Sequence, residues 1–274
     1  MASMFIAVPP PRIPAAPSDL GQPAGHRQGG RSADVEIIVS SNGSDGSPFA
    51  PAPPSSPADA PCPMTSTPGP VPQPRHAPAT LRNRDAIRSV LEQVLAECAL
   101  LLEIASGTGE HAAYMAPRLP GIRAWQPTDA STEALADIDA HVQAAAATTV
   151  RPALALDAAG SAWPVGRADA VLCCNMIHIA PWEAALGLFA GAGRVLPADG
   201  PLILYGPFRR HGVHTAPSNA AFDEGLRARD PRWGVRCLDR EVLPAAMAAS
   251  LRLDTIHAMP ANNLIVVLRK ASRE

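Results

Sequence analysis

A glycine-rich turn with acidic side chains near it is the first feature of this sequence that could do chemistry. The turn is Ser106-Gly107-Thr108-Gly109, and it follows a short apolar run, residues 99–105, that contains Glu103. Glycines let the backbone approach a bound molecule closely. Carboxylates beside such a turn can accept hydrogen bonds from ribose hydroxyls or from an adenine amino group. The turn therefore predicts a site for a nucleotide-like cofactor.

The next three predicted strands also end in polar side chains. Asp129 follows the second strand, Asp157 the third, and Asn175 with His178 the fourth. Because ligands of open α/β sheets bind at the carboxyl ends of the strands, we expect these side chains to meet at one site. Asp129 is assigned to the ribose and Asp157 to the adenine. The predicted cofactor-binding residues are Glu103, Gly107, Gly109, Asp129, Asp157 and Asn175.

The glycine turn alone does not identify the cofactor. Gly107-Thr-Gly109-Glu-His-Ala112 also fits the G-x-G-x-x-A form of a dinucleotide-binding turn, and Asp129 could be only a helix cap. The combination of acidic residues favours S-adenosylmethionine (SAM) over a nicotinamide as the cofactor. Glu103 stands four residues before Gly107, and a carboxylate follows each of strands two and three. An NAD(P)-dependent oxidoreductase stays as an alternative, as does a non-catalytic module that binds SAM or a partner.

His178 and Asn175 are the candidate catalytic residues. His178 could act as the base toward an oxygen or nitrogen acceptor, with Asn175 orienting that acceptor. A capping or core histidine is the other interpretation of His178. Arg209 with Arg210 is either a solvated pair or a group that holds an anionic substrate. The residues expected to line a substrate pocket are Tyr205, Phe208, Arg209 and His214.

Composition and charge narrow the class of protein. The five cysteines form no C-x-x-C pair, and His211 and His214 have no carboxylate or cysteine at ligand spacing, so we predict neither a metal site nor a disulfide framework. With 23 basic and 25 acidic side chains the chain lacks the basic excess of a nucleic-acid binder. No signal peptide and no apolar run of membrane-spanning length is evident. These features predict a cytoplasmic protein with a small-molecule substrate, and they indicate no particular oligomeric state.

Strands and helices alternate from residue 81 to residue 274. Apolar residues at three-and-four spacing predict a helix over 83–98. Further helices are expected over 111–119, 132–147, 181–196, 218–229 and 240–249, and strands over 99–105, 122–126, 151–156, 168–174, 201–205, 251–257 and 263–269. This alternation is typical of a mostly parallel sheet that is covered by helices on both faces, an α/β fold. The last two strands suggest an antiparallel hairpin.

Residues 1–80 have a different composition. Proline runs such as Pro9-Pro10-Pro11 alternate with Gly, Ser and Asn. Such a segment buries too little apolar surface to offset its conformational entropy, so we predict a disordered extension. Met64 is an alternative start of translation, and the mass of the natively expressed protein would decide between the two starts.

Two stretches of the sequence are especially specific, Asn175-Met-Ile-His-Ile-Ala-Pro-Trp182 and Tyr205-Gly-Pro-Phe208. Together with Arg82-Asn83, Leu102–Gly109, Trp125–Asp129, His214–Asn219, Trp233-Gly234 and Met259–Asn263, they resemble the methyltransferase-like 26 family of uncharacterised SAM-dependent methyltransferase-like proteins. The resemblance spans residues 81–274. It implies a class I methyltransferase (Rossmann-like) fold with seven strands, the last one antiparallel, and SAM as the cofactor of a methyltransferase whose acceptor it does not identify. Glu110 departs from the pattern, because relatives usually carry glutamine there.

Overall fold

The computed structural model describes residues 74–272 of the chain. The predicted disorder of residues 1–73 and the alternative start at Met64 lie outside these residues. Residues 78–80 were also predicted to be disordered, but they form the first turn of helix α1 (Pro78–Val94). Proline is well suited to the first turn of a helix, since its missing N–H would have no partner there. The folded part therefore begins earlier than residue 81.

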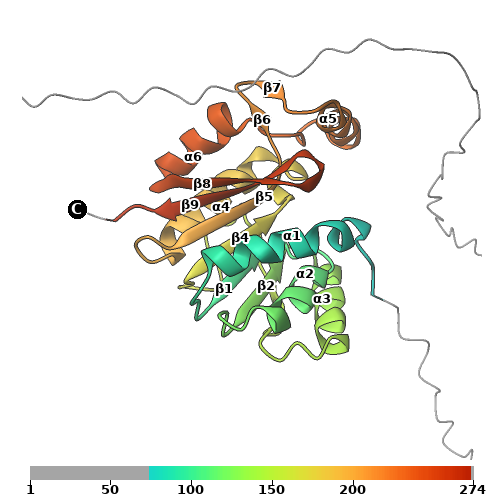
Figure 1. The fold of residues 1–274 in the computed structure, drawn as a ribbon, viewed down its shortest axis with the longest axis vertical. Coiled ribbons are helices and arrows are strands. Elements are labelled where there is room, and N and C mark those ends of the chain that lie inside the picture. The colour runs from blue at the N-terminus through green and yellow to red at the C-terminus, as the bar shows by residue number, and fades with distance from the viewer. Residues whose placement is uncertain (1–73, 273–274) are drawn as a thin grey trace, which may run out of the picture. The chain divides into compact units, whose positions relative to one another are not determined.

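A seven-stranded sheet forms the centre of the described residues (Figure 1). Strands β1 to β5 pair in parallel, whereas β9 is antiparallel to both of its neighbours, β5 and β8. This confirms the mostly parallel sheet, its antiparallel last strand and the terminal hairpin. Across the sheet the order is β3 (Leu154–Ala155), β2 (Trp125–Asp129), β1 (Leu101–Ile104), β4 (Ala170–Cys174), β5 (Pro201–Pro207), β9 (Asn263–Lys270) and β8 (Leu251–Met259).

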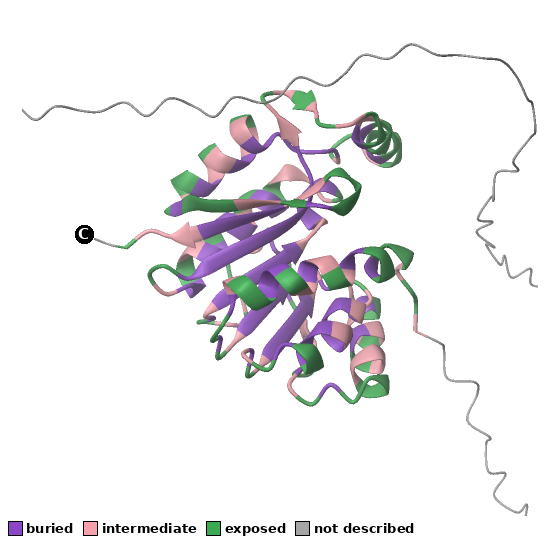
Figure 2. Ribbon diagram, in the orientation of Figure 1, coloured by how far each residue is buried: buried purple, intermediate pink, exposed green. Residues whose placement is uncertain are grey.

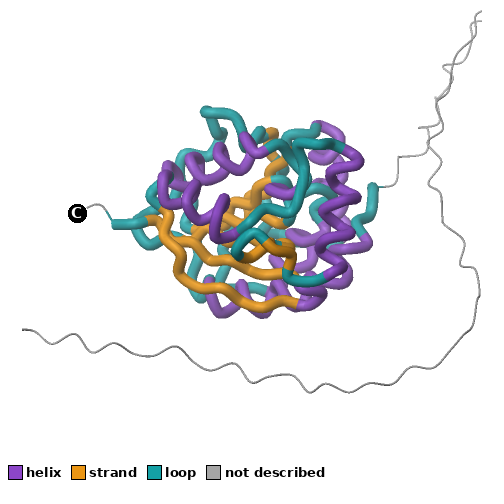
Figure 3. Tube along the Cα trace, turned by 90° about the horizontal axis from the view of Figure 1, so that it is seen from above, coloured by secondary structure: helices purple, strands orange, loops and turns teal. Residues whose placement is uncertain are grey.

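Helices cover both faces of this sheet, as predicted (Figure 3). One apolar cluster contains Leu188 and Phe189 of α4 and Ala246 of α6, and the other contains Ile87 and Leu91 of α1. Side chains of neighbouring residues in β1, β4 and β5 alternate between the two clusters, so these central strands are buried on both faces, whereas the edge strand β8 is largely exposed (Figure 2). The remaining helices are α2 (Glu110–Met115), α3 (Thr132–Ala144), α4 (Trp182–Val195), α5 (Pro217–Arg229) and α6 (Leu243–Ala248).

The second strand differs from its predicted bounds. The sequence indicated residues 122–126, because proline at 127 normally ends a central strand. In the structure β2 runs from Trp125 to Asp129 and contains Pro127. The missing N–H costs little there, because β3 pairs with β2 only at Thr128 and Asp129, and the Pro127 carbonyl accepts a hydrogen bond from the Gln126 amide at 3.1 Å. Asp129 is therefore the last residue of the strand.

The segment after β5 also differs. A loop was expected, but residues 209–214 form a two-stranded hairpin, β6 (Arg209–Arg210) and β7 (Val213–His214). The last predicted helix, 240–249, is a π-helical turn (Leu238–Val242) that continues into α6. Among residues 74–272, no helix combines the length and the apolar character that crossing a membrane requires.

Candidate functional site

The order of the strands puts a crevice beside the glycine turn. β1 lies between β2 and β4, so the chain leaves β1 and β4 in opposite directions at the carboxyl edge of the sheet. In open α/β sheets ligands bind at such a switch point. Short connections after β1 and β4 shape this edge: the glycine turn follows β1, and the 3₁₀ turn η2 (Met176–His178) follows β4.

The two glycines of the turn have different surroundings. Both have a left-handed backbone, with φ of 61° at Gly107 and 78° at Gly109. A Cβ atom on Gly107 would meet no other atom within 4 Å, whereas one on Gly109 would lie 2.6 Å from the Cα of Ile138 in α3. Gly107 thus leaves open space for a ligand, and Gly109 allows α3 to pack closely against the turn.

A cavity of about 290 Å³ lies at the carboxyl ends of β1 to β4. Gly107, Asp129 and Asp157 line it together, so the structure brings these three predicted residues to one place. Asp129 accepts hydrogen bonds from the Gly107 N–H at 2.9 Å and from the Ser131 N–H at 3.0 Å, which fixes its carboxylate at the cavity edge. The rest of the wall is mainly apolar, formed by Ile104, Ala105, Ala130, Leu156, Ala158, Cys174, Met176, Ile179, Ala180 and Ala184.

Glu103 and Gly109 do not line this cavity. The Glu103 side chain is 1% exposed and lies beneath the turn, where its Oε2 accepts a hydrogen bond from the Trp125 indole at 2.9 Å. Burial raises the pKa of Glu103 to about 7, although hydrogen bonds from Trp125 and Ser106 act against this rise. In the structure Glu103 links β1 to β2 instead of reaching the cavity.

A second, larger cavity of about 630 Å³ adjoins the first, and Ile179 belongs to both walls. Asn175 and Tyr205 line this second cavity. Asn175, which was also predicted to bind the cofactor, is absent from the wall of the first cavity. Asn175 has a left-handed backbone, with φ of 61°, and its N–H donates to the Tyr205 carbonyl at 2.7 Å. Sequence reasoning missed most of the other lining residues. They come from the N-terminal part of α1, from both ends of α5 and from the turn between β8 and β9: Ala79, Arg82, Asn83, Ser218, Asn219, Phe222, Arg229, Pro260, Ala261 and Asn263, besides Pro207.

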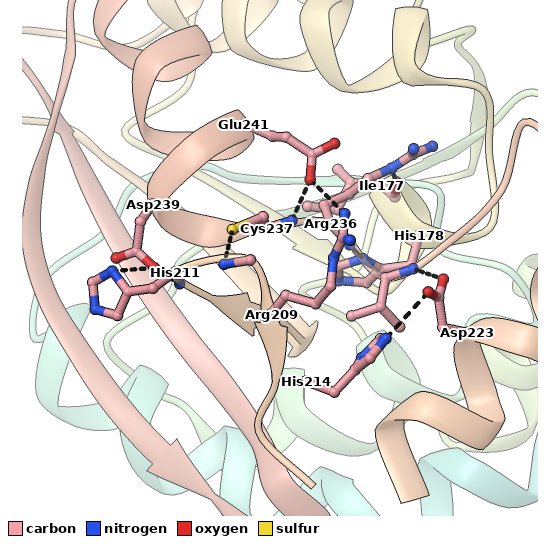
Figure 4. A network of polar contacts seen from close by, with 12 residues as sticks. Ile177, His178, Arg209, His211, His214, Asp223, Arg236, Cys237, Asp239 and Glu241 are labelled. Atoms are coloured by element: carbon pink, nitrogen blue, oxygen red, sulfur yellow. Dashed lines mark hydrogen bonds and ion pairs between the residues drawn. The ribbon is translucent and has the colours of Figure 1, made fainter. Parts of the chain in front are cut away.

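Three predicted pocket residues lie elsewhere. Phe208 is fully buried in the core. Arg209 donates to the Glu241 carboxylate at 2.9 Å, and His214 Nε2 lies 3.3 Å from the Asp223 carboxylate (Figure 4). The reason is that the chain turns back after β5 into the β6–β7 hairpin, in which Arg209 pairs with His214. The hairpin holds both side chains away from the cavity wall.

His178 is fully buried and is absent from the walls of both cavities. Its Nδ1 accepts a hydrogen bond from the Arg236 backbone N–H at 3.3 Å. Its Nε2 has no hydrogen-bond partner among the described residues and faces Gly206, where an added Cβ would lie 2.7 Å from Nε2 and 3.2 Å from Asn175 Oδ1. Burial, and then the charge of Arg236, lower the pKa of His178 to about 3. His178 is thus a buried, neutral side chain that lines neither cavity.

Arg236 is a structural residue of the site that sequence reasoning did not find. Its guanidinium donates hydrogen bonds to the Ile177 carbonyl and to the Ala180 carbonyl, both at 2.9 Å (Figure 4). These bonds fix the backbone on both sides of Ile179. The backbone next to Arg236 is held in turn by Asp223 of α5, whose carboxylate accepts a hydrogen bond from the Val235 N–H at 2.7 Å. Arg236 stands in an irregular stretch with no periodic pattern, which gave no signal of this role.

His76, Glu110 and His141 form a cluster whose potential ligand atoms lie within 4.8 Å of one another. The Glu110 carboxylate is already occupied: it accepts the Ala77 N–H at 2.7 Å and the Thr108 hydroxyl at 2.9 Å, and His76 Nδ1 lies 3.0 Å away. Burial raises the pKa of Glu110, but these contacts outweigh it and leave the pKa below the usual value. Glu110 thus fastens residues 76 and 77 to the glycine turn, and we assign no metal to the cluster.

Solved structures of methyltransferases share this fold. An O-methyltransferase family protein from Burkholderia thailandensis matches with a TM-score of 0.62 and 16% identity over 72% of this chain and 58% of that one. The S-adenosylmethionine-dependent methyltransferase SibL, in its apo form, gives 0.59 and 18% over 71% and 56%. PigF with SAH gives 0.54 and 19% over 63% and 51%. The chain spans just over half the length of these three proteins, and it has the class I methyltransferase fold.

A family model provides a closer assignment than these folds do. The model describes a protein of unknown function, DUF938, and it matches residues 74–270, which include every strand and helix of the sheet domain and both cavities. The match therefore begins before the first helix, in agreement with the observed start of the fold. This chain belongs to the DUF938 family.

Proposed function

We propose that this protein is a SAM-dependent methyltransferase with a small-molecule acceptor. The main support for this proposal is that Gly107, Asp129 and Asp157 line one cavity at the switch point of the sheet. The fold shared with SibL and with PigF, the latter solved with SAH, supports the same cofactor. The proposal agrees with the resemblance to the methyltransferase-like 26 family, which we retain as part of it.

The lining residues fit the adenosyl part of such a cofactor. Asp129 accepts hydrogen bonds from the ribose hydroxyls, and Asp157 accepts one from the adenine amino group. The open side of Gly107 admits the ligand close to the backbone. When bound, SAM supplies a methyl group that is activated by a positively charged sulfur.

The second cavity, which shares Ile179 with the first, holds the acceptor. Asn175 and Tyr205 orient it with hydrogen bonds, and burial, which raises the pKa of Tyr205, keeps the phenol a proton donor. His178 is a positioning residue, because its backbone N–H donates to the Asn175 carbonyl at 3.0 Å and its buried ring fixes that turn. Holding both reactants in the correct geometry is the main contribution of the protein, since direct methyl transfer needs no covalent intermediate.

Binding of the reaction product S-adenosylhomocysteine to the full chain tests this proposal. We expect calorimetry to give a micromolar dissociation constant, which corresponds to about −8 kcal/mol. Asp129→Asn keeps the size of the side chain but replaces one acceptor oxygen with a donor. It should weaken binding about tenfold or more, since hydrogen bonds to charged groups contribute roughly 1.5–3 kcal/mol. Glu97→Gln, at an exposed position before β1, is the matched control and should bind as the wild type does.

The same titration includes NADH, and each result has a defined meaning. NADH binding without S-adenosylhomocysteine binding would replace the proposal with an NAD(P)-dependent oxidoreductase. If neither NADH nor S-adenosylhomocysteine binds, the result would favour a partner-binding module in which the cavity holds no cofactor. S-adenosylhomocysteine binding that survives Asp129→Asn would remove Asp129 from the site.

A further inference from the structure

The second cavity carries two positive side chains and no carboxylate. Its charged lining residues are Arg82 of α1 and Arg229 of α5, and neither forms an ion pair within 4.0 Å among residues 74–272. Two other arginines of these helices are paired, Arg88 with Glu92 and Arg227 with Asp223, whereas Arg84 of α1 lies over the Tyr114 ring outside the cavity. The Arg229 Nε donates to the Gly225 carbonyl at 3.3 Å, and its guanidinium carbon lies 5.8 Å from the centroid of the Trp233 ring, so neither of these contacts brings a negative charge to it. The positive charge at this cavity is therefore not neutralised by the described part of the chain.

Two helix N-termini add to this charge. Ala79 in the first turn of α1 and Ser218 and Asn219 in the first turn of α5 line the cavity. Both helices begin with proline near their first position, and neither has a side-chain cap. The N–H groups of a first turn carry the positive end of the helix dipole and attract anions. Here the N–H groups of Thr80 and Asn219 already donate to the carbonyls of Ala77 and Ala216, at 2.9 and 3.1 Å, so the dipole is the part of this attraction that both helices retain. α1 has 17 residues and α5 has 13, so both dipoles are fully developed.

The rest of the wall suits an apolar body. Tyr205, Phe222 and Ile179 offer broad apolar surfaces, and Pro207 and Pro260 add rigid ones. Asparagine side chains stand among them and can bind either donors or acceptors. The cofactor cavity, by contrast, has Asp129 and Asp157 in its wall. The two adjoining cavities thus differ in the sign of their charged groups.

From these observations we infer that the methyl acceptor is a small organic acid, a carboxylate on an apolar or aromatic body. Arg82 and Arg229 bind its carboxylate, while the apolar wall holds the body with the methyl-accepting atom toward Ile179 and the cofactor cavity. The inference rests on the proposed methyltransferase function and specifies the substrate class for it. It also accounts for the lack of an acidic partner at either arginine among residues 74–272.

Matched pairs of acids and amides test this inference. The probes are benzoate with benzamide and 4-hydroxybenzoate with 4-hydroxybenzamide, titrated by ligand-observed NMR into the full chain with saturating S-adenosylhomocysteine. Each amide has nearly the shape of its acid but no charge. We expect each acid to bind at least about tenfold more tightly than its amide, a difference of about 1.4 kcal/mol.

The arginines are tested by substitution. In the double variant Arg82→Gln with Arg229→Gln, the preference for the acid should fall below about twofold. Arg167→Gln, which removes an exposed arginine outside the cavity, should leave it unchanged. The inference would be overturned if acid and amide bind equally tightly, or if no acid binds. It would also be overturned if Arg167→Gln reduces the preference for the acid as much as the double variant does.

The two proposals fail in different ways. If S-adenosylhomocysteine binds but no acid is preferred, the substrate class is wrong and the proposed function stands. If the acids are preferred in the absence of any S-adenosylhomocysteine binding, the cavity is an anion site of a protein with another function, and the inference about an acceptor falls with the methyltransferase.

Discussion

Replacing Gly109 with alanine is expected to lower the free energy of unfolding by about 3 kcal/mol, whereas the same change at Gly107 should lower it by only about 1 kcal/mol. Both positions have a left-handed backbone, which alanine adopts with strain. Only at Gly109 would the new methyl group also meet backbone, 2.6 Å from the Ile138 Cα. Relieving that contact requires α3 to move away from the turn.

Urea denaturation of both variants at pH 7.5 measures the difference, and binding of S-adenosylhomocysteine provides a second, independent measurement. Gly107→Ala places its methyl group in open space beside the cavity, so it should weaken binding in a protein that remains nearly as stable as the wild type. Equal losses of stability at the two positions would contradict the distinct roles that the structure gives them.

The second large effect concerns His178 and pH. On acidification from pH 7.5 to pH 5, the wild type should lose about 2 kcal/mol of stability that His178→Asn does not lose. Burial lowers the pKa of His178 to about 3 in the folded state, whereas an unfolded histidine has a pKa of about 6.5. Between these values the unfolded chain takes up a proton that the folded chain does not, so stability falls as the pH falls. Asparagine does not titrate, and its Oδ1 can accept the Arg236 N–H in place of Nδ1.

The measured quantity is the stability gap between wild type and variant at pH 7.5, 6.5 and 5. Burial also lowers the pKa of His111 to about 4 and raises that of Glu103 to about 7, but both groups are present in both proteins and cancel in the comparison. The control is Phe189→Leu, a core substitution that removes no titratable group. The difference in stability between the wild type and Phe189→Leu should stay constant with pH. If the difference between the wild type and His178→Asn is constant too, the His178 ring takes up a proton equally in the folded and unfolded chain.

Features that depend on local pattern were predictable from the sequence. Apolar runs punctuated by glycine, aspartate and proline located the strands, and the helix and strand alternation gave the parallel sheet. Asp129 and Asp157 met at one cavity because the carboxyl ends of parallel strands share an edge. This argument from strand ends does not apply to Glu103. Glu103 lies inside β1, so its side chain points to one face of the sheet and cannot reach the carboxyl edge.

The substrate pocket was predictable only in part, and strand periodicity gives the reason. Side chains alternate along a strand, and β5 continues to Pro207, past its predicted end at residue 205. Tyr205 therefore packs with the α1 cluster and faces the second cavity, whereas Phe208, at an odd separation, joins the α4 cluster. The other walls come from the N-terminal part of α1, from both ends of α5 and from the turn between β8 and β9. The rule that ligands bind at the carboxyl ends of parallel strands does not reach these segments.

Ile179 stands in the walls of both cavities, and Arg236 fixes the backbone on both sides of it. A molecule in either cavity therefore meets the same side chain, and the two affinities are thermodynamically linked. By reciprocity, the factor by which one ligand changes the affinity of the second must equal the factor in the reverse direction. A cofactor that moves Ile179 toward the acceptor cavity would thus change the affinity for the acceptor, and Ile179→Ala would bring the coupling factor toward one.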